Sequence, residues 1–463
     1  MAKAAKAKVL KFDAAGPGLS KAEILKVCDA ENVRFMRLQF TDILGIIKNV
    51  EVPRSQFNKA LDGEIQFDGS SIEGFTRIEE SDMNLVADLS SFAIYPWAHN
   101  KGEKVGRLIC DVYNPDGTPF PGCPRMTLKK QMEKAAALGY VMVTGPEAEF
   151  FLFRRDADGD PVVDTHDQGA YFDLTPVDRG EEARRDIVLA LEQMGFEVEA
   201  AHHEVAPGQH EIDFKYAGAV TTADRVSTFR FIVKKVAMDH GLHATFMPKP
   251  IFGVNGSGMH VHQSFLDRKG SNVFYDPKAK YQLSKTALNY TGGILNHATA
   301  FVAVTNPLVN SYKRLVPGYE APVNLAYSRR NRSASIRIPV YSPNPKAKRI
   351  EFRCPDGSSN PYLVFSAMLM AMIDGIKNKT RPGDPLDKDI YDLSPEELKD
   401  VPKTPSSLSA ALDFLEKDNE FLLQGDVFTD DVISTWIWYK REKEVDAIRL
   451  RPHPYEFALY YDI

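Results

Sequence analysis

Residues 145–153 read GPEAEFFLF, two glutamates in front of a run of aromatic and aliphatic side chains. In a β-strand, side chains two positions apart share a face, so Glu147 and Glu149 are expected to point the same way. A Glu-x-Glu pair is usually a solvated face of a strand. Here, however, residues 150–153 are all apolar. The stretch therefore predicts a strand in apolar surroundings whose two carboxylates project together.

A second acidic pair flanks a turn signal. Glu204 and Glu211 are seven positions apart, a spacing that would place them on opposite faces of one straight strand. Pro207-Gly208 lies between them and can turn the chain, so that both carboxylates point inward. We therefore expect strands over residues 196–205 and 209–216 with a turn between them.

Two further segments repeat the two-residue spacing. His260 and His262 share one face of a strand predicted over residues 259–265, and Glu351 and Arg353 share one face of a short strand over residues 349–353. An isolated His-x-His pair is more often two ordinary histidines than a pair of ligands. The combination of all four segments is what favours a common site.

Five carboxylates in one concavity repel one another, and bound cations make such a site tolerable. Carboxylate oxygens are hard ligands that suit Mg²⁺ or Mn²⁺. Two such ions can clamp the oxygens of a transferring phosphoryl group, and the dense arginines of the later sequence supply fixed positive charge. The sequence thus indicates an enzyme that handles phosphate with metal ions. These arginines are Arg314, Arg329, Arg330, Arg332, Arg337, Arg349 and Arg353.

The whole chain argues against several classes of protein. Its 463 residues carry a net charge of −6, which is unlike a nucleic-acid binder. The four scattered cysteines form no Cys-x-x-Cys pair and are expected to be reduced thiols. The densest apolar run, residues 362–373, is too short to span a bilayer, and no signal peptide is recognised. The segment NGSGMH (255–260) is neither a Walker loop nor a GxGxxG motif. We expect a cytoplasmic protein.

A loop rich in proline and glycine, NPDGTPFPGCP (114–124), is the best candidate for a linker. We therefore predict a flexible tail over residues 1–19, an N-terminal domain over 20–122 and a C-terminal domain over 123–463. Helices are expected over residues 20–32, 126–138, 181–194, 221–240, 286–303 and 361–379, and a cap at 394–397 predicts another. Early strands are expected over residues 33–40, 46–52 and 108–113.

The same segments, in this order, resemble the glutamine synthetase family, type I, of bacteria and archaea. The resemblance covers nearly all of residues 20–463, and motifs of this length are highly specific. The segments that carry it are FTDILG (40–45), FDGSSIEGF (67–75), ESDM (80–83), GPEAEFFLF (145–153), HHEVAPGQHEIDF (202–214), NGSGMHVHQS (255–264), KRLVPGYEAPV (313–323), NRSASIRIP (331–339) and RIEFRCPD (349–356).

The resemblance implies an α+β fold, with a small N-terminal β-grasp-like domain and a large C-terminal catalytic domain in which helices flank a curved antiparallel sheet. It implies an ATP-dependent ligase that joins ammonia to L-glutamate through a γ-glutamyl phosphate, for nitrogen assimilation. Two or three divalent cations, Mg²⁺ or Mn²⁺, are expected in each active site. The expected assembly is a homo-oligomer, a dodecamer of two hexameric rings with active sites between subunits. Nitrogen-regulatory proteins are expected as further partners, without nucleic acid or membrane.

The resemblance also implies a role for individual residues. The metal ligands it implies are Glu149, Glu204 and Glu211 for one ion and Glu147, His260 and Glu351 for another. The positions expected to bind glutamate are Asn255, Gly256, Arg314 and Arg353.

The remaining implied roles concern the nucleotide and the chemistry. The positions expected to bind ATP are His262, Ser264, Arg337 and Arg349. Catalytic roles fall on Asp68 and Glu320, which attract ammonium and take its proton, and on Arg332 beside the transferred phosphoryl group. Asp68 is expected to act in the active site of the neighbouring subunit.

The subtype depends on two positions. Arg77, in GFTRIEESD, resembles the branch that is inhibited by glutamine and is not adenylylated, whereas Tyr391 matches the position that is adenylylated in another branch. We favour the first branch. Two alternatives to glutamine synthesis are a ligase that joins glutamate to a polyamine or another amine, and a non-enzymatic scaffold or regulator of transcription factors. Asp68 and Glu320 favour ammonia, and the presence of every catalytic ligand argues against a pure scaffold.

Overall fold

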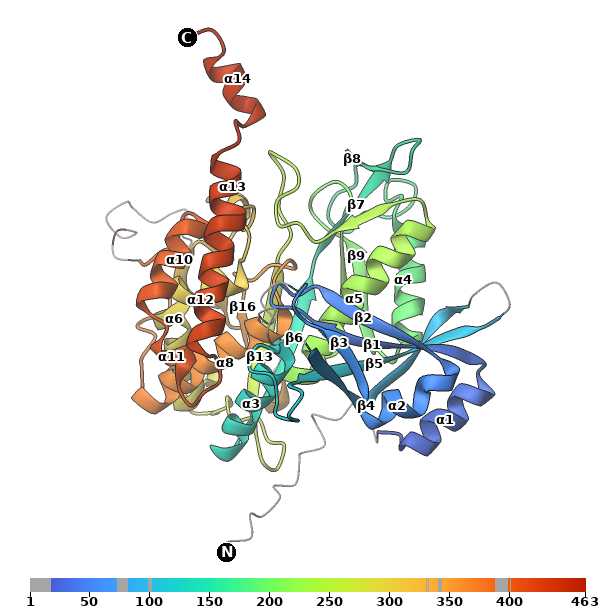
Figure 1. Ribbon diagram of the computed structural model, residues 1–463. Helices are drawn as coiled ribbons and strands as arrows, with labels where there is room; N and C mark the ends of the chain where they lie inside the picture. The colour runs from blue at the N-terminus through green and yellow to red at the C-terminus, as the bar shows by residue number, and fades with distance from the viewer. Residues whose placement is uncertain are drawn as a thin grey trace, which may run out of the picture.

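The computed structural model describes residues 18–72, 82–98, 102–329, 331, 333–339, 344–387, 399 and 401–463. Within these ranges the chain forms a five-stranded sheet near the N-terminus and two further sheets, which are flanked by helices (Figure 1). The expected α+β class is therefore confirmed. The predicted cap at 394–397, and with it Tyr391, lies outside the described residues.

The N-terminal sheet has the order β2-β1-β5-β4-β3, in which β1 and β5 run parallel and the other pairs antiparallel. This is the expected β-grasp-like part. Helix α1 begins with the predicted capping box, since the Ser20 and Glu23 side chains each bond the other's backbone N–H. The elements are α1 (Lys21–Ala30), β1 (Val33–Thr41), β2 (Ile47–Pro53), α2 (Phe57–Asp62), β3 (Ile65–Asp68), β4 (Asp82–Ala98) and β5 (Lys104–Tyr113).

The rest of the chain contains two sheets. One has the order β12-β7-β10-β9, with β8 paired to β7, and the other has the order β11-β6-β13-β16-β15-β14. All pairs are antiparallel except β14–β15. The strands are β6 (Tyr140–Ala148), β7 (Phe150–Arg155), β8 (Pro161–Thr165), β9 (Val198–His203), β10 (Gln209–Phe214), β11 (Ala217–Gly218), β12 (His243–Thr245), β13 (Met259–Asp267), β14 (Asn324–Ser328), β15 (Ala334–Arg337) and β16 (Ile350–Phe352).

Helices cover these two sheets and extend the chain to its C-terminus. Helix α3 begins two residues before its predicted start because Pro124 fits the first helical position. The last helix, α14, projects away from the body of the molecule (Figure 1). The helices are α3 (Pro124–Ala137), α4 (Glu181–Gln193), α5 (Ala219–Asp239), α6 (Lys285–Thr305), α7 (Ser311–Arg314), α8 (Pro361–Asn378), α10 (Leu408–Lys417), α11 (Glu420–Leu423), α12 (Asp430–Tyr439), α13 (Asp446–Arg449) and α14 (Pro454–Tyr460).

The β1–β2 loop is bonded to the larger part of the chain. Asn360, the N-cap of α8, donates to the backbone carbonyls of Asp42 (3.0 Å) and Ile43 (3.1 Å). Arg230 on α5 donates to the carbonyl of Gly45 (2.6 Å). Gly45 has φ +83°, and a Cβ there would lie 2.8 Å from the Asn360 Cα, so only glycine fits. The N-terminal sheet is thus held firmly against the rest, while a domain boundary near residue 122 stays a prediction.

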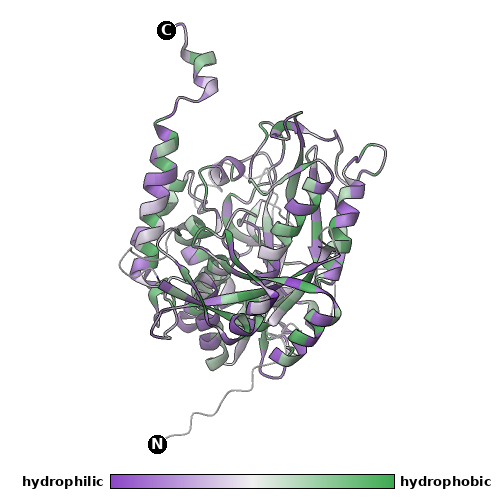
Figure 2. Ribbon diagram, turned by 45° about the vertical axis from the view of Figure 1, so that its right-hand side comes forward, coloured by the Kyte–Doolittle hydropathy of each residue, from purple (hydrophilic) through white to green (hydrophobic). Residues whose placement is uncertain are grey.

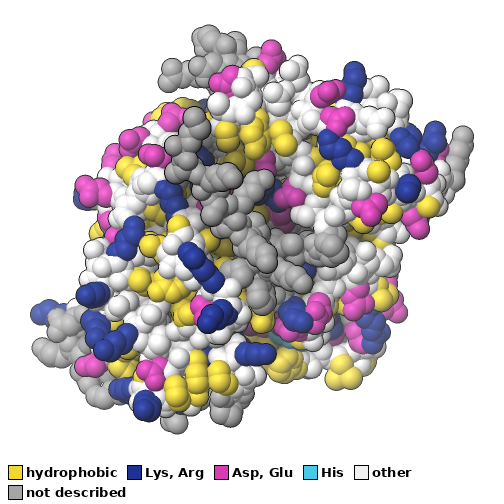
Figure 3. Space-filling view, turned by 90° about the horizontal axis from the view of Figure 1, so that it is seen from below, with side chains coloured by type: hydrophobic (Ala, Val, Ile, Leu, Met, Phe, Trp, Pro, Cys, Tyr) yellow, Lys and Arg dark blue, Asp and Glu magenta, His cyan; other side chains and the backbone are white. Residues whose placement is uncertain are grey.

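The surface is that of a globular protein with mixed charge. Surface helices carry both hydrophobic and hydrophilic residues (Figure 2), as expected for helices that pack on a core by one side. Basic and acidic side chains are interspersed on the face shown in Figure 3. None of the described helices combines the length and apolarity needed to cross a membrane. All four cysteines are buried and free of disulfides in the described structure.

Candidate active site

The register of the six-stranded sheet sets the positions of the predicted ligands. In the β6–β13 pair, Glu147 lies opposite His260. In the β13–β16 pair, His262 lies opposite Glu351, and Glu351 in turn lies opposite Arg337 on β15. Directly opposed residues, and residues two apart on one strand, point to the same face of a sheet. These five side chains therefore project from one face.

The first group of ligands is formed by Glu147, His260 and Glu351, whose ligating atoms all lie within 4.8 Å of one another. His260 Nδ1 is 3.6 Å from Glu147 Oε2 and 3.8 Å from Glu351 Oε1. Glu351 is completely buried, and it pairs with Arg353 Nη1 (2.5 Å) and with Arg337 Nε. The structure thus brings together three side chains from three different strands.

The second group is formed by His202, Glu204 and Glu211, also within 4.8 Å. His202 Nε2 is 3.2 Å from Glu211 Oε1, and its Nδ1 is 3.7 Å from Glu204 Oε1. The turn over residues 204–209 makes this possible, since Gly208 adopts φ +69° and the Glu204 N–H bonds the Gln209 carbonyl (2.8 Å). Both glutamates therefore point inward, as the Pro-Gly signal predicted.

Glu149 connects the two strand systems. It follows the last residue of β6 and precedes β7, and its carboxylate is buried. Oε2 accepts hydrogen bonds from Gln209 Nε2 (2.9 Å) and from the Gly258 N–H (3.0 Å). The carboxylate is therefore held between the turn that follows Glu204 and the glycine-rich segment before β13.

The electrostatics of the site fit bound cations. Burial, opposed by Arg314, raises the pKa of Glu149 to about 7. Burial and the charge of Glu149 raise the pKa of Glu204 to about 8. Burial, with the charges of Glu149 and Asp213, holds the pKa of Glu211 well above its usual range. Raised pKa values reflect the cost of burying several carboxylates together, and divalent ions would stabilise all three in the ionised form. The donor set, oxygen with histidine nitrogen, suits Mg²⁺ or Mn²⁺.

The residues predicted to bind glutamate surround the glycine-rich segment. A Cβ on Gly256 would lie 2.3 Å from the Pro248 carbonyl oxygen and 3.2 Å from Arg314 Cγ, so no side chain fits there. Arg314 is buried and donates to the backbone carbonyls of Cys354 (2.8 Å) and Arg353 (3.2 Å). Burial lowers the pKa of Arg314. The buried Nε of Arg353 has no hydrogen-bond partner among the described residues, which leaves a donor for a ligand.

Asn255, which is also predicted to bind glutamate, begins the glycine-rich segment and is half-buried. The residues predicted to bind ATP lie on β13 and its neighbours. Arg349 Nε donates to His262 Nδ1 (3.1 Å), so His262 carries its hydrogen on Nε2 and donates to Glu147 Oε1 (2.7 Å). Burial would raise the pKa of Glu147, but hydrogen bonds from His260 and His262 outweigh it and hold that pKa well below the usual range. Ser264 follows on the same face of β13 and is buried. Arg337 contacts these residues indirectly, because its Nε pairs with the Glu351 carboxylate.

The loop after α7 carries Glu320, which is exposed and adopts φ +54°. Such a conformation is strained for a residue with a side chain. The charge of Glu320 contributes to the raised pKa of Glu204, after burial and Glu149, which places the loop beside the second ligand group. Its neighbour Tyr319 stacks on Lys249, whose Nζ lies 4.0 Å from the ring centroid. Lys249 therefore links this loop to the segment that leads to β13.

Three predicted residues are not part of this convergence in the described structure. Asp68, at the end of β3, is exposed, and in the described part of the chain its carboxylate accepts hydrogen bonds from the Ser70 N–H (2.8 Å) and hydroxyl (2.7 Å). Arg77 and Arg332 lie outside the described residues. Within one chain the structure therefore brings together the residues predicted to bind metal and glutamate, whereas Asp68 lies on β3 at the edge of the N-terminal sheet.

Sequence reasoning missed His202, Gln209 and Asp213. His202 lies opposite Glu211 in the β9–β10 pair, so a hairpin centred on Pro207-Gly208 would have placed it there. Gln209 bonds Glu149, a residue distant in sequence, and no local pattern indicates that contact. Asp213 shares a strand face with Glu211, and burial raises its pKa to about 7.

Comparisons with known proteins agree on one family over most of the chain. The family described as glutamine synthetase, β-grasp domain, matches residues 32–115, and glutamine synthetase, catalytic domain, matches residues 121–460. A glutamine synthetase of Thermus thermophilus is 56% identical over 96% of this chain and 99% of its own length. One of Clostridium saccharobutylicum is 52% identical over 95% of this chain and 98% of its own.

Solved structures give the same result. The glutamine synthetase of Plasmodium falciparum, solved by cryo-electron microscopy, superposes with a TM-score of 0.85 at 30% identity, over 96% of this chain and 99% of that one. A GmaS complex with ADP superposes with a TM-score of 0.85 at 32% identity, over 95% of this chain and 99% of that one.

Proposed function

Since this chain belongs to the glutamine synthetase family, we propose that it uses ATP to join ammonia to the side-chain carboxylate of L-glutamate, giving L-glutamine, ADP and phosphate. The observation that carries this proposal is that two groups of acids and histidines form in one chain, Glu147–His260–Glu351 and His202–Glu204–Glu211, and that arginines pair with the first. A site with these donors can hold divalent ions and anionic substrates together.

We assign two cations to the site. The family resemblance assigns Glu149, Glu204 and Glu211 to the first, and Glu147, His260 and Glu351 to the second. The second set is also a close group in the structure, and Glu204 and Glu211 form another with His202. Two or three ions are expected in each active site, and Mg²⁺ or Mn²⁺ suits the donor set. When bound, the ions neutralise phosphate charge and orient the nucleotide.

The chain's own residues would bind and activate the amino acid. Arg314 and Arg353 offer buried guanidinium groups to glutamate, and Asn255 and Gly256 complete that pocket. A free carboxylate is a poor acyl donor, so its phosphorylation to γ-glutamyl phosphate supplies a leaving group. Arg332, Arg337 and Arg349 stabilise the charge that develops on the transferred group, while His262 and Ser264 contact ATP.

Ammonium must lose a proton before it can attack the acyl phosphate. We assign its attraction to Asp68 and the acceptance of its proton to Glu320. The loop that carries Glu320 closes over the intermediate and excludes water, which would hydrolyse it. Its strained φ and its proximity to Glu204 support a role beside the metal site.

We propose that the working enzyme is a homo-oligomer, a dodecamer of two six-membered rings. Asp68 is exposed on its own chain and is available to the site of a neighbouring subunit. Helix α14 stands clear of the body and exposes Tyr455, Phe457 and Leu459, which is expected of a segment that packs on another copy. The location is expected to be cytoplasmic, and glutamine synthesis here would serve nitrogen assimilation.

The alternative acceptor is a larger amine. The metal and ATP positions would serve such a ligase equally well, whereas Asp68 and Glu320 favour ammonia. Glutamine synthesis predicts that ammonia is the preferred acceptor over putrescine and ethanolamine at equal concentration. Faster turnover with either amine would mean that this amine, and not ammonia, is the substrate.

Phosphate release from ATP tests the proposal directly. The assay contains glutamate, with and without ammonia, across a titration of Mg²⁺. We expect release to require glutamate and metal and to rise strongly with ammonia, with one glutamine formed per phosphate. An enzyme that consumes no ATP when both substrates are supplied would refute the proposal.

Regulation is proposed from the subtype. Arg77 supports the branch that glutamine inhibits, and nitrogen-regulatory proteins are expected as partners. The control experiment for the scaffold alternative is the same phosphate assay, since a pure scaffold would release none.

A further inference from the structure

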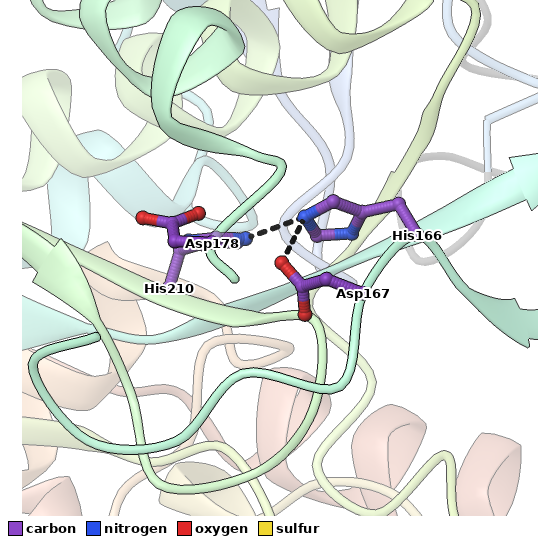
Figure 4. A group of neighbouring side chains, drawn as sticks. All are labelled: His166, Asp167, Asp178 and His210. Carbon is purple, nitrogen blue, oxygen red and sulfur yellow. Dashed lines mark hydrogen bonds and ion pairs between the residues drawn. The ribbon is translucent and has the colours of Figure 1, made fainter. Parts of the chain in front are cut away.

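A buried polar network lies behind the turn that carries Glu204. Its core is formed by His166, Asp167, Asp178 and His210, whose side chains point toward one another (Figure 4). All four are at most 5% exposed. His166 Nε2 lies 2.8 Å from Asp167 Oδ2 and 3.3 Å from His210 Nε2. Buried polar groups of this kind are costly unless they are bonded, so their partners indicate what the network does.

The existing bonds of Asp167 and His210 argue against a metal ion within this buried network. Asp167 Oδ1 accepts the N–H of Gly208 (2.9 Å), and Oδ2 accepts the N–H of Arg179 (3.1 Å). Arg184 Nη1 donates to His210 Nδ1 (2.8 Å). Because an arginine can only donate, a neutral His210 carries its hydrogen on Nε2, the nitrogen that would face the ion. The group is therefore built to hold chain segments together.

Asp167 reaches both ends of the turn over residues 204–209. At one end Oδ1 accepts the Gly208 N–H directly. At the other end Oδ1 lies 3.2 Å from His203 Nε2, and the Nδ1 of the same ring lies 2.6 Å from the Glu204 carbonyl oxygen. The His203 ring thus bridges Asp167 and the backbone of Glu204. The turn is held at two points by one completely buried carboxylate.

The packing leaves the histidines no alternative position. A Cβ on Gly169 would lie 2.6 Å from His203 Nε2, and a Cβ on Gly180 would lie 2.6 Å from His166 Nε2. Both rings therefore lie directly against main chain and cannot rotate without displacing it. Through these packed rings, Asp167 therefore holds the turn over residues 204–209 in one position.

We infer that Asp167 is a positioning residue that sets the Glu204 turn for binding of the cation held by Glu149, Glu204 and Glu211. This inference rests on the metal assignment of the proposed function. Outer partners that orient metal ligands typically contribute about 10- to 100-fold in metal affinity. Asp167 acts through the backbone of the turn and touches neither the ion nor the substrates.

The test is Mn²⁺ binding, measured by isothermal titration calorimetry on the assembled enzyme without ATP. We expect the Asp167→Ala variant to bind Mn²⁺ about 10- to 100-fold more weakly at one class of site, while the class formed by Glu147, His260 and Glu351 keeps its affinity. The conservative Asp167→Asn variant keeps one acceptor oxygen and is expected to show a smaller loss. In activity assays the Mn²⁺ concentration for half-maximal rate should rise, with kcat largely recovered at saturating Mn²⁺.

The matched control is Asp374→Asn, which removes a carboxylate that also partners a histidine, His297, but lies on α8. Its melting temperature is expected to fall while its Mn²⁺ affinity stays that of the wild type. Wild-type affinity in Asp167→Ala, or a drop of equal size in Asp374→Asn, would overturn the inference. If Asp167→Ala does not fold, unchanged affinity in Asp167→Asn overturns it. Wild-type protein that binds no Mn²⁺ would instead refute the metal assignment itself.

Discussion

Glu147 and His260 are direct partners in the β6–β13 register, and their side chains approach to 3.6 Å between Oε2 and Nδ1. They come from positions more than a hundred residues apart in the sequence. The site is therefore held by the hydrogen-bonded ladder of the sheet, which is more rigid than a loop. Changes to single side chains in this row should remove function without unfolding the protein.

The first prediction concerns the ligands themselves. Glu149→Ala or Glu351→Ala should lower glutamine formation by at least about 100-fold, because removal of a ligand costs more than removal of its outer partner. The assembly should remain folded, since each change removes one side chain while the hydrogen-bonded ladder of the sheet, which positions the others, stays intact. Size-exclusion chromatography and circular dichroism check the fold. Near-normal turnover in either variant would contradict the assignment.

A second prediction concerns the contact between Lys249 and Tyr319. Lys249→Met removes a cation–π contact worth about 1–2 kcal/mol, so the loop carrying Glu320 should close less often. We expect glutamine formation to fall about 5- to 30-fold and more than one phosphate to be released per glutamine. Lys249→Arg preserves the contact and serves as the control. If Lys249→Met still releases one phosphate per glutamine formed, this lysine does not hold the loop.

A third prediction concerns Asn360, which caps α8 and bonds the β1–β2 loop. Asn360→Ala removes the cap and leaves the carbonyls of Asp42 and Ile43 without that donor, a loss of about 1–3 kcal/mol. The melting temperature should fall by several degrees in a thermal scan. Asn378→Ala, at the exposed end of the same helix, should change it little. Equal melting temperatures for the two variants would contradict the proposed anchor.

A fourth prediction concerns pH and stability. Burial alone would lower the pKa of His297, but hydrogen bonds with Asp418 (2.8 Å) and Asp374 (3.1 Å) outweigh it and raise that pKa above its usual value of 6.5. A raised pKa in the folded state stabilises the protein fully below about pH 6.5, and this contribution disappears as pH rises through the folded value.

The wild-type melting temperature should therefore fall between about pH 6 and about pH 8.5 by more than that of His297→Gln. The difference between the two curves isolates the contribution of His297 from other groups that titrate in this range. Parallel curves would mean that His297 titrates alike in the folded and unfolded chains.

A fifth prediction concerns regulation. Arg77→Ala should relieve inhibition by glutamine, with the inhibition constant rising at least about 10-fold and the uninhibited rate nearly unchanged. Initial rates at increasing glutamine concentration measure it. Unchanged inhibition would remove the support for the glutamine-inhibited branch.

The amino-acid pattern predicted the parts of this protein whose causes are local. The Pro-Gly turn before Glu211 depends on neighbours in the chain and was predicted correctly. The same reasoning predicted most helix positions, with shifts of about two residues at ends such as that of α3. The single strand expected to carry both Glu147 and Glu149 is instead interrupted at Glu149, between β6 and β7.

The parts that escaped prediction depend on contacts between distant segments. Asp167 and His203 are 36 residues apart, and their pairing exists only because β9 folds back beside the segment after β8. The division of the catalytic part into two sheets likewise depends on which strands pair, and single-sequence patterns do not specify partners. Roles in catalysis followed from the family resemblance, because residue spacing alone does not distinguish a metal ligand from a substrate-binding side chain.

The two faces of strand β10 lie in different environments. His210 faces the buried histidines, and Glu211, the next residue, faces His202 and Glu204. Deleting one residue from this strand would exchange the two sides, bringing a carboxylate into the histidine cluster and an imidazole beside Glu204. In functional variants of this protein, insertions and deletions in β10 should consequently be rarer than substitutions at most of its positions.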